Sequence, residues 1–277
     1  MKKQIKRISA LMVALLFVLC CGCASTTHGQ QQENEKYYQA TTYGGTPIGS
    51  VNETIEYDHK TTNECMISTG IPEYYAFGYT CGISAGGNVV AYYNKQYPTL
   101  IPGHLAGMDF FGTWCWMGQN EYIDALHTNL YIAMGANPSG TTLWGYLGGL
   151  ASYVGGKGKS LAISDVSDTS SSLDPAYIAA INDNKLITLF LDGFNIIDNG
   201  AGFNTYNGYD IAKFTEYFGA HVMVAYGYKI VSYYDDQNYM FREDTYLYVG
   251  TSYNIGNALL RINTNCTIDE AYVTQVF

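Results

Sequence analysis

The sequence predicts an α+β protein in which a helical N-terminal lobe and an antiparallel β-sheet C-terminal lobe are separated by a cleft. Two observations predict this class. Between residues 119 and 134, apolar side chains recur at spacings of three and four, which is the period of a helix packed on one face, and segments 81–95 and 142–154 on either side also read as helices. From residue 185 onward, short runs rich in Val, Ile, Leu and Tyr alternate with polar turns, which favours strands. Helices followed by antiparallel strands are typical of α+β proteins.

Each helix is indicated by its pattern and its boundaries. The expected helices cover residues 81–95, 119–134, a segment ending at Val154, and residues 175–184. Thr141 or Thr142 is expected to cap the third, because a Thr hydroxyl can accept a hydrogen bond from a free N–H group of the first turn. The pair Gly86-Gly87 costs about 1 kcal/mol per glycine in helix propensity. We therefore expect another segment to pack closely against the first helix at this point.

The expected strands follow one another in the second half of the chain, and they cover residues 185–191, 221–231, 245–250, 258–262 and 271–276. A polar turn around residue 237 joins the second of these strands to the third as a hairpin. Reflecting residue 221 about residue 237 gives residue 253, so His221 is expected beside segment 251–254. Asp235 and Asp236 are at the other end of the hairpin, roughly 45 Å away at about 3.3 Å per residue.

Residues 1–22 resemble a bacterial lipoprotein signal peptide. Four positive charges are followed by an apolar run that ends near Leu19, too short to span a membrane comfortably. Gly22 then precedes Cys23, the residue expected to be lipidated after cleavage, with Cys21 as the alternative and an ordinary secretory signal as the simpler interpretation. The mature protein is expected to be lipid-anchored to the bacterial cell membrane, facing outside.

Beyond the signal, residues 23–60 are polar and are expected to be a tether, with a single folded domain over residues 61–277. Removing the signal changes the formal net charge from −10 to −14, because four basic residues leave and no acidic residue does. Such a surface repels phosphate backbones, so nucleic-acid binding is not expected.

Four cysteines remain after the signal region: Cys65, Cys81, Cys115 and Cys266. Their spacing does not match a zinc site, and neither a metal nor another cofactor is expected. Export permits disulfides. If Cys81 is a nucleophile, at most one bridge can form among the other three.

Cys81 stands where a reactive thiol would be built. It lies at the predicted start of a helix, where unpaired N–H groups and the positive end of the helix dipole favour the thiolate, the nucleophilic form. His221 begins a predicted strand 140 residues later and is the candidate base. A buried small thiol and a satisfied core histidine are the simpler interpretations of these two residues.

Three segments resemble the papain-like cysteine peptidases, in particular the bacterial C39-like branch related to bacteriocin-processing peptidases. They are the predicted helix start CGISAGGNVVAYY at 81–93, the predicted strand GAHVMVAYGY at 219–228, and YLYVGTSYN at 246–254. The resemblance implies a papain-like two-lobed fold over residues 61–277. It also implies a cell-surface cysteine peptidase acting on peptide or protein substrates.

By this resemblance, Cys81 attacks the carbonyl carbon, and His221 forms an ion pair with the thiolate and then protonates the leaving amine. Asn254 orients the imidazole, with Thr251 as the alternative. The chain lacks the family's Gln shortly before the nucleophile. The Cys81 backbone N–H, Tyr75 or Tyr79 would therefore stabilise the oxyanion.

The sequence is also compatible with two other functions. The predicted histidine strand also resembles that of Cys/His peptidoglycan amidases or endopeptidases, although Cys81 lacks the Asp-Cys-Ser-Gly context typical of those enzymes. The other is a catalytically inactive papain-like domain that serves binding or adhesion.

Overall fold

The structure is a computed structural model that describes residues 37–38, 46–67, 70–74, 80–104, 107–108, 114–115, 120–167, 173, 175–197, 202–253 and 258–277. Its helices within these ranges are α2 (Cys81–Asn94), α3 (Glu121–Ala133), α4 (Leu143–Gly156) and α5 (Pro175–Asn182). Its strands are β1 (Tyr37–Tyr38), β2 (Thr46–Glu56), β3 (His59–Met66), β4 (Gly107–Met108), β5 (Trp114–Cys115), β6 (Thr141–Thr142), β7 (Leu161–Asp165), β8 (Leu186–Ile197), β9 (Phe203–Tyr206), β10 (Tyr209–Tyr234), β11 (Met240–Gly250), β12 (Ala258–Arg261) and β13 (Ile268–Val276).

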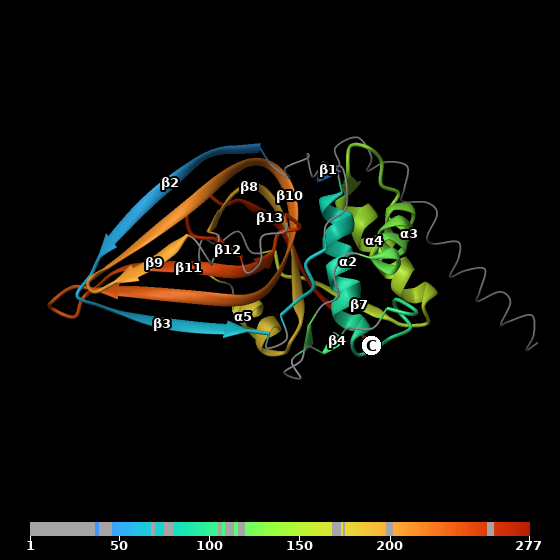
Figure 1. Ribbon diagram of the computed structural model, residues 1–277, viewed down its shortest axis with the longest axis horizontal. Helices are drawn as coiled ribbons and strands as arrows, with labels where there is room; N and C mark the ends of the chain where they lie inside the picture. Colours follow the sequence, from blue (N-terminus) through green and yellow to red (C-terminus); the bar gives the residue numbers. More distant parts are fainter. Residues whose placement is uncertain are drawn as a thin grey trace, which may run out of the picture. The chain divides into compact units, whose positions relative to one another are not determined.

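The expected fold class, a papain-like helical lobe facing a sheet lobe, is wrong. Nine strands form one large antiparallel sheet that dominates the described chain (Figure 1). Two of them, β2 and β3, precede the first described helix and pair with β10. The sheet therefore draws on both ends of the domain instead of forming a separate second half.

The predicted tether, residues 23–60, overlaps the folded sheet. Residues 46–60 contain β2 and the first residues of β3, so the sheet begins within the range expected to be a linker. These strands lack a clear apolar alternation because most of their side chains are exposed, Ile55 being a buried exception. Backbone pairing with β10, rather than apolar burial, holds them in place.

Strand β10 organises the sheet. Its first half pairs with β2, β8 and β9, and its second half pairs with β3 and β11 (Figure 1). The pairing with β8 is interrupted between Tyr217 and Ala220, where Gly219 has φ +108°, a conformation that favours glycine. Because β8 also pairs with β12, and β12 with β11, the pairings β10–β11–β12–β8–β10 close a ring.

Helix α2 is the central helix, since all of its side chains are buried. It packs on β10 and against α3 and α4. The close approach expected at its glycine pair is confirmed. A Cβ atom at Gly86 would lie 2.7 Å from Met134 Cε, and one at Gly87 would lie 2.5 Å from His127 Nε2.

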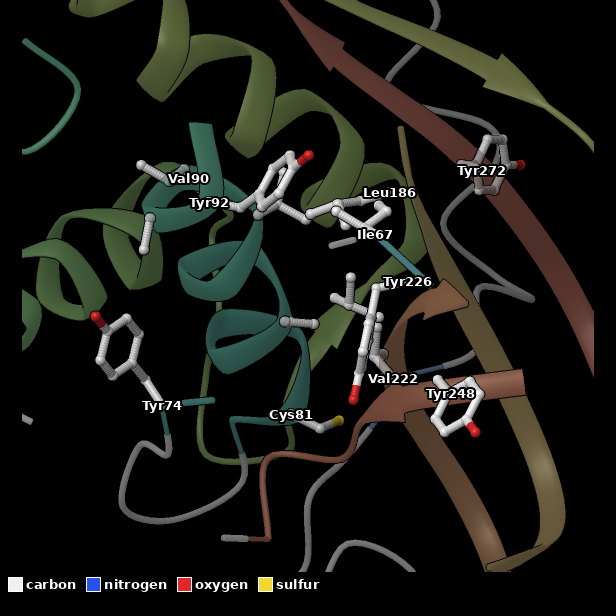
Figure 2. Packing of buried hydrophobic residues seen from close by; sticks show 14 of the residues in the cluster. Ile67, Tyr74, Cys81, Val90, Tyr92, Leu186, Val222, Tyr226, Tyr248 and Tyr272 are labelled. Carbon is white, nitrogen blue, oxygen red and sulfur yellow. The ribbon is translucent and has the colours of Figure 1, made fainter. Parts of the chain in front are cut away.

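Strands β8 and β10 are covered on both faces. One apolar cluster joins them to α2, α3 and α4, and a second joins them to α5 (Figure 2 shows part of the first). Double burial explains why the start of β8 reads as a continuous apolar run rather than an alternating one.

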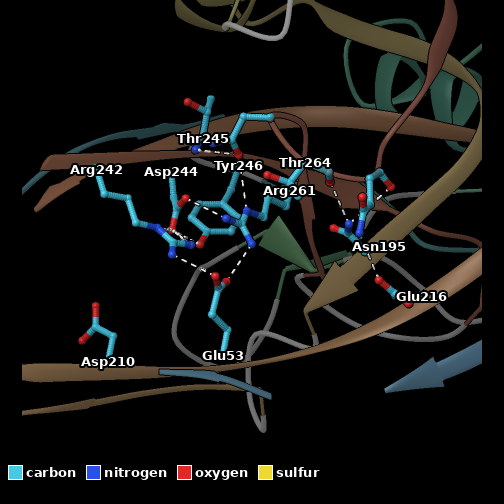
Figure 3. A network of polar contacts seen from close by, with 12 residues as sticks. Glu53, Asn195, Asp210, Glu216, Arg242, Asp244, Thr245, Tyr246, Arg261 and Thr264 are labelled. Carbon is cyan, nitrogen blue, oxygen red and sulfur yellow. Dashed lines mark hydrogen bonds and ion pairs between the residues drawn. The ribbon is translucent and has the colours of Figure 1, made fainter. Parts of the chain in front are cut away.

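A partly buried ion network links β2, β11 and β12 (Figure 3). Arg261 donates to Glu53 at 2.8 Å and to Asp244 at 2.9 Å, and Arg242 contacts the same two carboxylates at 2.8 and 2.9 Å. Asp244 is only 1% exposed, so removing a guanidinium would leave a buried carboxylate with fewer partners, which is costly. Nearby on β10, the buried Asp210 pairs with Lys60 at 2.7 Å.

Candidate functional site

Cys81 is the first residue of α2, as expected, and its side chain points toward β10 at Val222 (Figure 2). The N–H groups of Val222, Gly82 and Cys81 itself are placed to stabilise a negative charge on the sulfur. The side chain is nevertheless only 1% exposed and belongs to the apolar cluster around α2. Burial outweighs the three N–H groups and raises the pKa of the Cys81 thiol to about 12, so the resting thiol is neutral.

His221 lies next to Val222 on β10 and is completely buried. Its Nε2 atom is 2.9 Å from the carbonyl oxygen of Thr251. Its ring stacks on Tyr253, with centroids 4.7 Å apart, and on Phe194, at 5.4 Å. The hairpin prediction, which put His221 beside segment 251–254, is confirmed.

The bond to Thr251 determines the tautomer of His221. A carbonyl oxygen can only accept a hydrogen bond, so Nε2 carries the proton and Nδ1 has a free lone pair. Nδ1 is buried and has no hydrogen-bond partner among the groups that the structure describes. Burial lowers the pKa of His221 to about 4, and the contact with Thr251 only partly opposes this, so the imidazole is neutral at pH 7.

The link between the two candidate residues that the structure describes runs through Val222, which follows His221 on β10 and whose N–H faces the sulfur of Cys81. Cys81 lies against Val222, whose side chain faces the α2 cluster, while the ring of the adjacent His221 stacks on Phe194 of the second cluster. Nδ1 of His221 has no hydrogen-bond partner among the described groups, and both the thiol and the imidazole are neutral at pH 7, so they do not form an ion pair at rest. The resting arrangement therefore differs from the ion pair expected from the sequence.

Thr251, the alternative third residue, contacts His221 through its main chain and not its side chain. Its hydroxyl and its N–H both donate to Glu73 Oε1 at 3.0 Å. Asn254, the first choice, lies outside the described residues, as do Tyr75 and Tyr79. The backbone N–H groups of Cys81 and Gly82 remain the described candidates for an oxyanion site.

Three residues at this site were missed by sequence reasoning. Glu73 reaches Thr251 across the fold. Tyr253 covers the ring of His221, and Ser252 between them has φ +63°. The Ser252 Oγ and Tyr253 OH atoms are buried, and neither has a partner in the described structure. The position of Tyr253 follows from the hairpin reflection that put segment 251–254 beside His221, but no sequence signal identified Glu73.

Two of the remaining cysteines, Cys65 and Cys266, lie in the described part of the chain, and none of their described contacts is with Cys81 or His221. Cys65 and Cys266 carry thiols and form no disulfide, and burial raises the pKa of Cys266 to about 12. The side chain of Cys115 and the predicted lipidation site Cys23 lie outside the described part of the chain. Within that part, no group of three or more His, Cys, Asp or Glu side chains is arranged to hold a metal ion. None of the described helices is both long and apolar enough to cross a bilayer.

Comparisons of the chain with protein-family models, with curated proteins and with solved structures gave no match. The resemblance to cysteine peptidases therefore stays a prediction that rests on the residues themselves.

Proposed function

We propose that this protein is a cysteine-type peptidase in which Cys81 is the nucleophile and His221 the general base. One observation carries the proposal. The thiol at the start of α2 packs against β10 next to a histidine whose Nε2 is held by a carbonyl and whose Nδ1 lone pair is buried without a described partner. A buried polar atom without a partner is costly, and a catalytic role is one of the few reasons for keeping it.

The proposed reaction is acyl transfer. As the sulfur of Cys81 bonds to the carbonyl carbon of a peptide bond, its proton passes to His221 Nδ1. The N–H groups of Cys81 and Gly82 stabilise the oxyanion. The imidazolium then protonates the leaving amine, the C–N bond breaks, and a thioester remains. Water, activated by the neutral imidazole, hydrolyses the thioester and regenerates the thiol.

Proton transfer must accompany attack instead of preceding it. Moving a proton from a thiol with pKa about 12 to an imidazole with pKa about 4 costs roughly 11 kcal/mol at 1.36 kcal/mol per pKa unit. Attraction between the two ions, even 4 Å apart, returns only about 4 kcal/mol at an effective dielectric constant of 20. The resting pair is therefore neutral, and the reaction requires the buried sulfur of Cys81 to become accessible to substrate.

The proposed setting is the outer face of a bacterial membrane, with a lipid on Cys23 and peptides or proteins as substrates. Support for export comes only from the sequence of residues 1–23, which combines a basic start, a short apolar run and the Gly22–Cys23 junction.

The test is covalent labelling of the full chain with a peptidyl acyloxymethyl ketone, which alkylates nucleophilic thiols. The modified residue is identified by peptide mass spectrometry. We expect labelling at Cys81 that is lost in Cys81→Ala and retained in Cys65→Ala, which removes another thiol of the described fold. A folded protein that shows no modification at Cys81 would overturn the proposal.

A non-catalytic binding domain is the second candidate, and the burial of Cys81 favours it. A sulfur that is 1% exposed and has a raised pKa is also what a structural cysteine presents. In that case, the probe reacts with Cys81 only after unfolding in urea, and Cys81→Ala lowers stability without affecting any reaction.

A further inference from the structure

Glu73 and Thr251 are joined by two hydrogen bonds. One carboxylate oxygen of Glu73 accepts from both the N–H and the hydroxyl of Thr251, each at 3.0 Å. The N–H of Ser252 also favours the ionised carboxylate, whereas burial opposes it and raises the pKa of Glu73. Glu73 therefore accepts hydrogen bonds from two successive residues, Thr251 and Ser252, of the segment that follows β11.

That segment needs such support. Ser252 adopts φ +63°, which a non-glycine side chain rarely does, at a cost of order 1–3 kcal/mol. The hydroxyl of Thr251 also accepts from the N–H of Tyr253 at 3.2 Å. Glu73 and Thr251 together thus fix the turn that directs the Thr251 carbonyl at His221 Nε2 and places the Tyr253 ring on the imidazole.

We propose that Glu73 is a positioning residue for His221, acting through the main chain of Thr251. Hydrogen bonds from Thr251 to Glu73 hold the Thr251 carbonyl in place. That carbonyl keeps the proton of His221 on Nε2, so Nδ1 remains the acceptor for the thiol proton of Cys81. A backbone carbonyl, held by a carboxylate, takes the orienting role for which Asn254 was expected. The catalytic part of this inference rests on the proposed function, but the positioning of the imidazole does not.

The experiment compares the full-length wild type with Glu73→Ala and Glu73→Gln. Glu64→Gln is the matched control, because Glu64 is also a partly exposed carboxylate that accepts a hydrogen bond, from Tyr248, but has no contact with His221. Two readouts are used. The ¹⁵N chemical shifts of the His221 ring report the tautomer, with His221→Gln to assign the signal, and the reaction rate with the peptidyl probe reports nucleophilicity.

We expect the wild type and Glu64→Gln to show one Nε2–H tautomer. Glu73→Ala should show a mixture of tautomers and react with the probe at least about tenfold more slowly, because part of the imidazole then has the wrong tautomer. Glu73→Gln retains one acceptor oxygen and should lie between them, and it serves as the test if Glu73→Ala does not fold. A merely structural role would lower stability but leave both the tautomer and the rate of the folded protein unchanged, and that result would overturn the inference.

Different experimental results would overturn the peptidase proposal and the positioning role of Glu73. If Cys81 of the wild type does not react while the Glu73 variants still shift the tautomer of His221, the positioning stands and the peptidase proposal fails. If Cys81 reacts in a His221-dependent way while the Glu73 variants keep the wild-type tautomer, Glu73 has no positioning role.

Discussion

Acidification should destabilise this protein through its buried histidines, and His221 gives the sharpest case. The pKa of His221 is lowered from 6.5 to about 4 by burial, so the unfolded chain binds a proton at pH 4–6.5 that the folded chain does not. Stability therefore falls as pH decreases from about 6.5, and the loss is nearly complete near pH 4. At pH 4, this single group should remove about 3 kcal/mol of stability.

The assay is urea unfolding of the wild type, His221→Gln and His127→Gln at pH 7.5 and pH 4, followed by tyrosine and tryptophan fluorescence. His127 is the matched control, because burial also lowers its pKa to about 4 although it lies on α3, away from the site. Each variant should lose about 3 kcal/mol less than the wild type between the two pH values. Equal losses in His221→Gln and the wild type would show that the imidazole is not buried in its neutral form, and the tautomer argument would fail with it.

Two further predictions concern the framework that holds the site. Arg261→Met should lower the free energy of unfolding by about 3 kcal/mol, because it removes a guanidinium from the buried Asp244. A urea midpoint equal to that of the wild type would show that the ion network does not stabilise the fold. Gly87→Ala should lower the free energy of unfolding by about 1–3 kcal/mol, because its Cβ would meet His127. Gly148→Ala in α4 is the control; its Cβ would meet nothing within 4 Å, so it should be neutral or stabilising. A higher melting temperature for Gly87→Ala than for Gly148→Ala would contradict the packing of α2.

The parts of the fold that could be predicted are those with a strong apolar signal. α3 shows helical spacing of apolar residues, and β8 and the second half of β10 show continuous apolar runs. β2, β3 and β9 are mostly exposed, and therefore their sequences contain Thr, Asn, Glu and Lys without a clear period. Missing them gave the wrong fold class, since these strands turn the predicted C-terminal sheet into one sheet built from both ends of the domain.

The candidate site was predictable where local geometry determines it. The start of a helix located Cys81, and hairpin symmetry placed His221 beside segment 251–254, in which Thr251 was the second choice of partner after Asn254. Glu73 was not predictable, because its contact with Thr251 joins residues 178 positions apart through a segment without periodic pattern. Nor could the pattern around Cys81 reveal that burial would outweigh the favourable helix start and keep its thiol protonated.

The most direct test of the Cys81–His221 pair is the second-order rate constant for alkylation of Cys81 by the peptidyl acyloxymethyl ketone, measured against pH in the wild type and in His221→Gln. If His221 accepts the proton of the thiol, the folded variant should react at least about 100-fold more slowly than the wild type near neutral pH. Equal rate constants in the two folded proteins would contradict the pairing and leave Cys81 as a structural thiol.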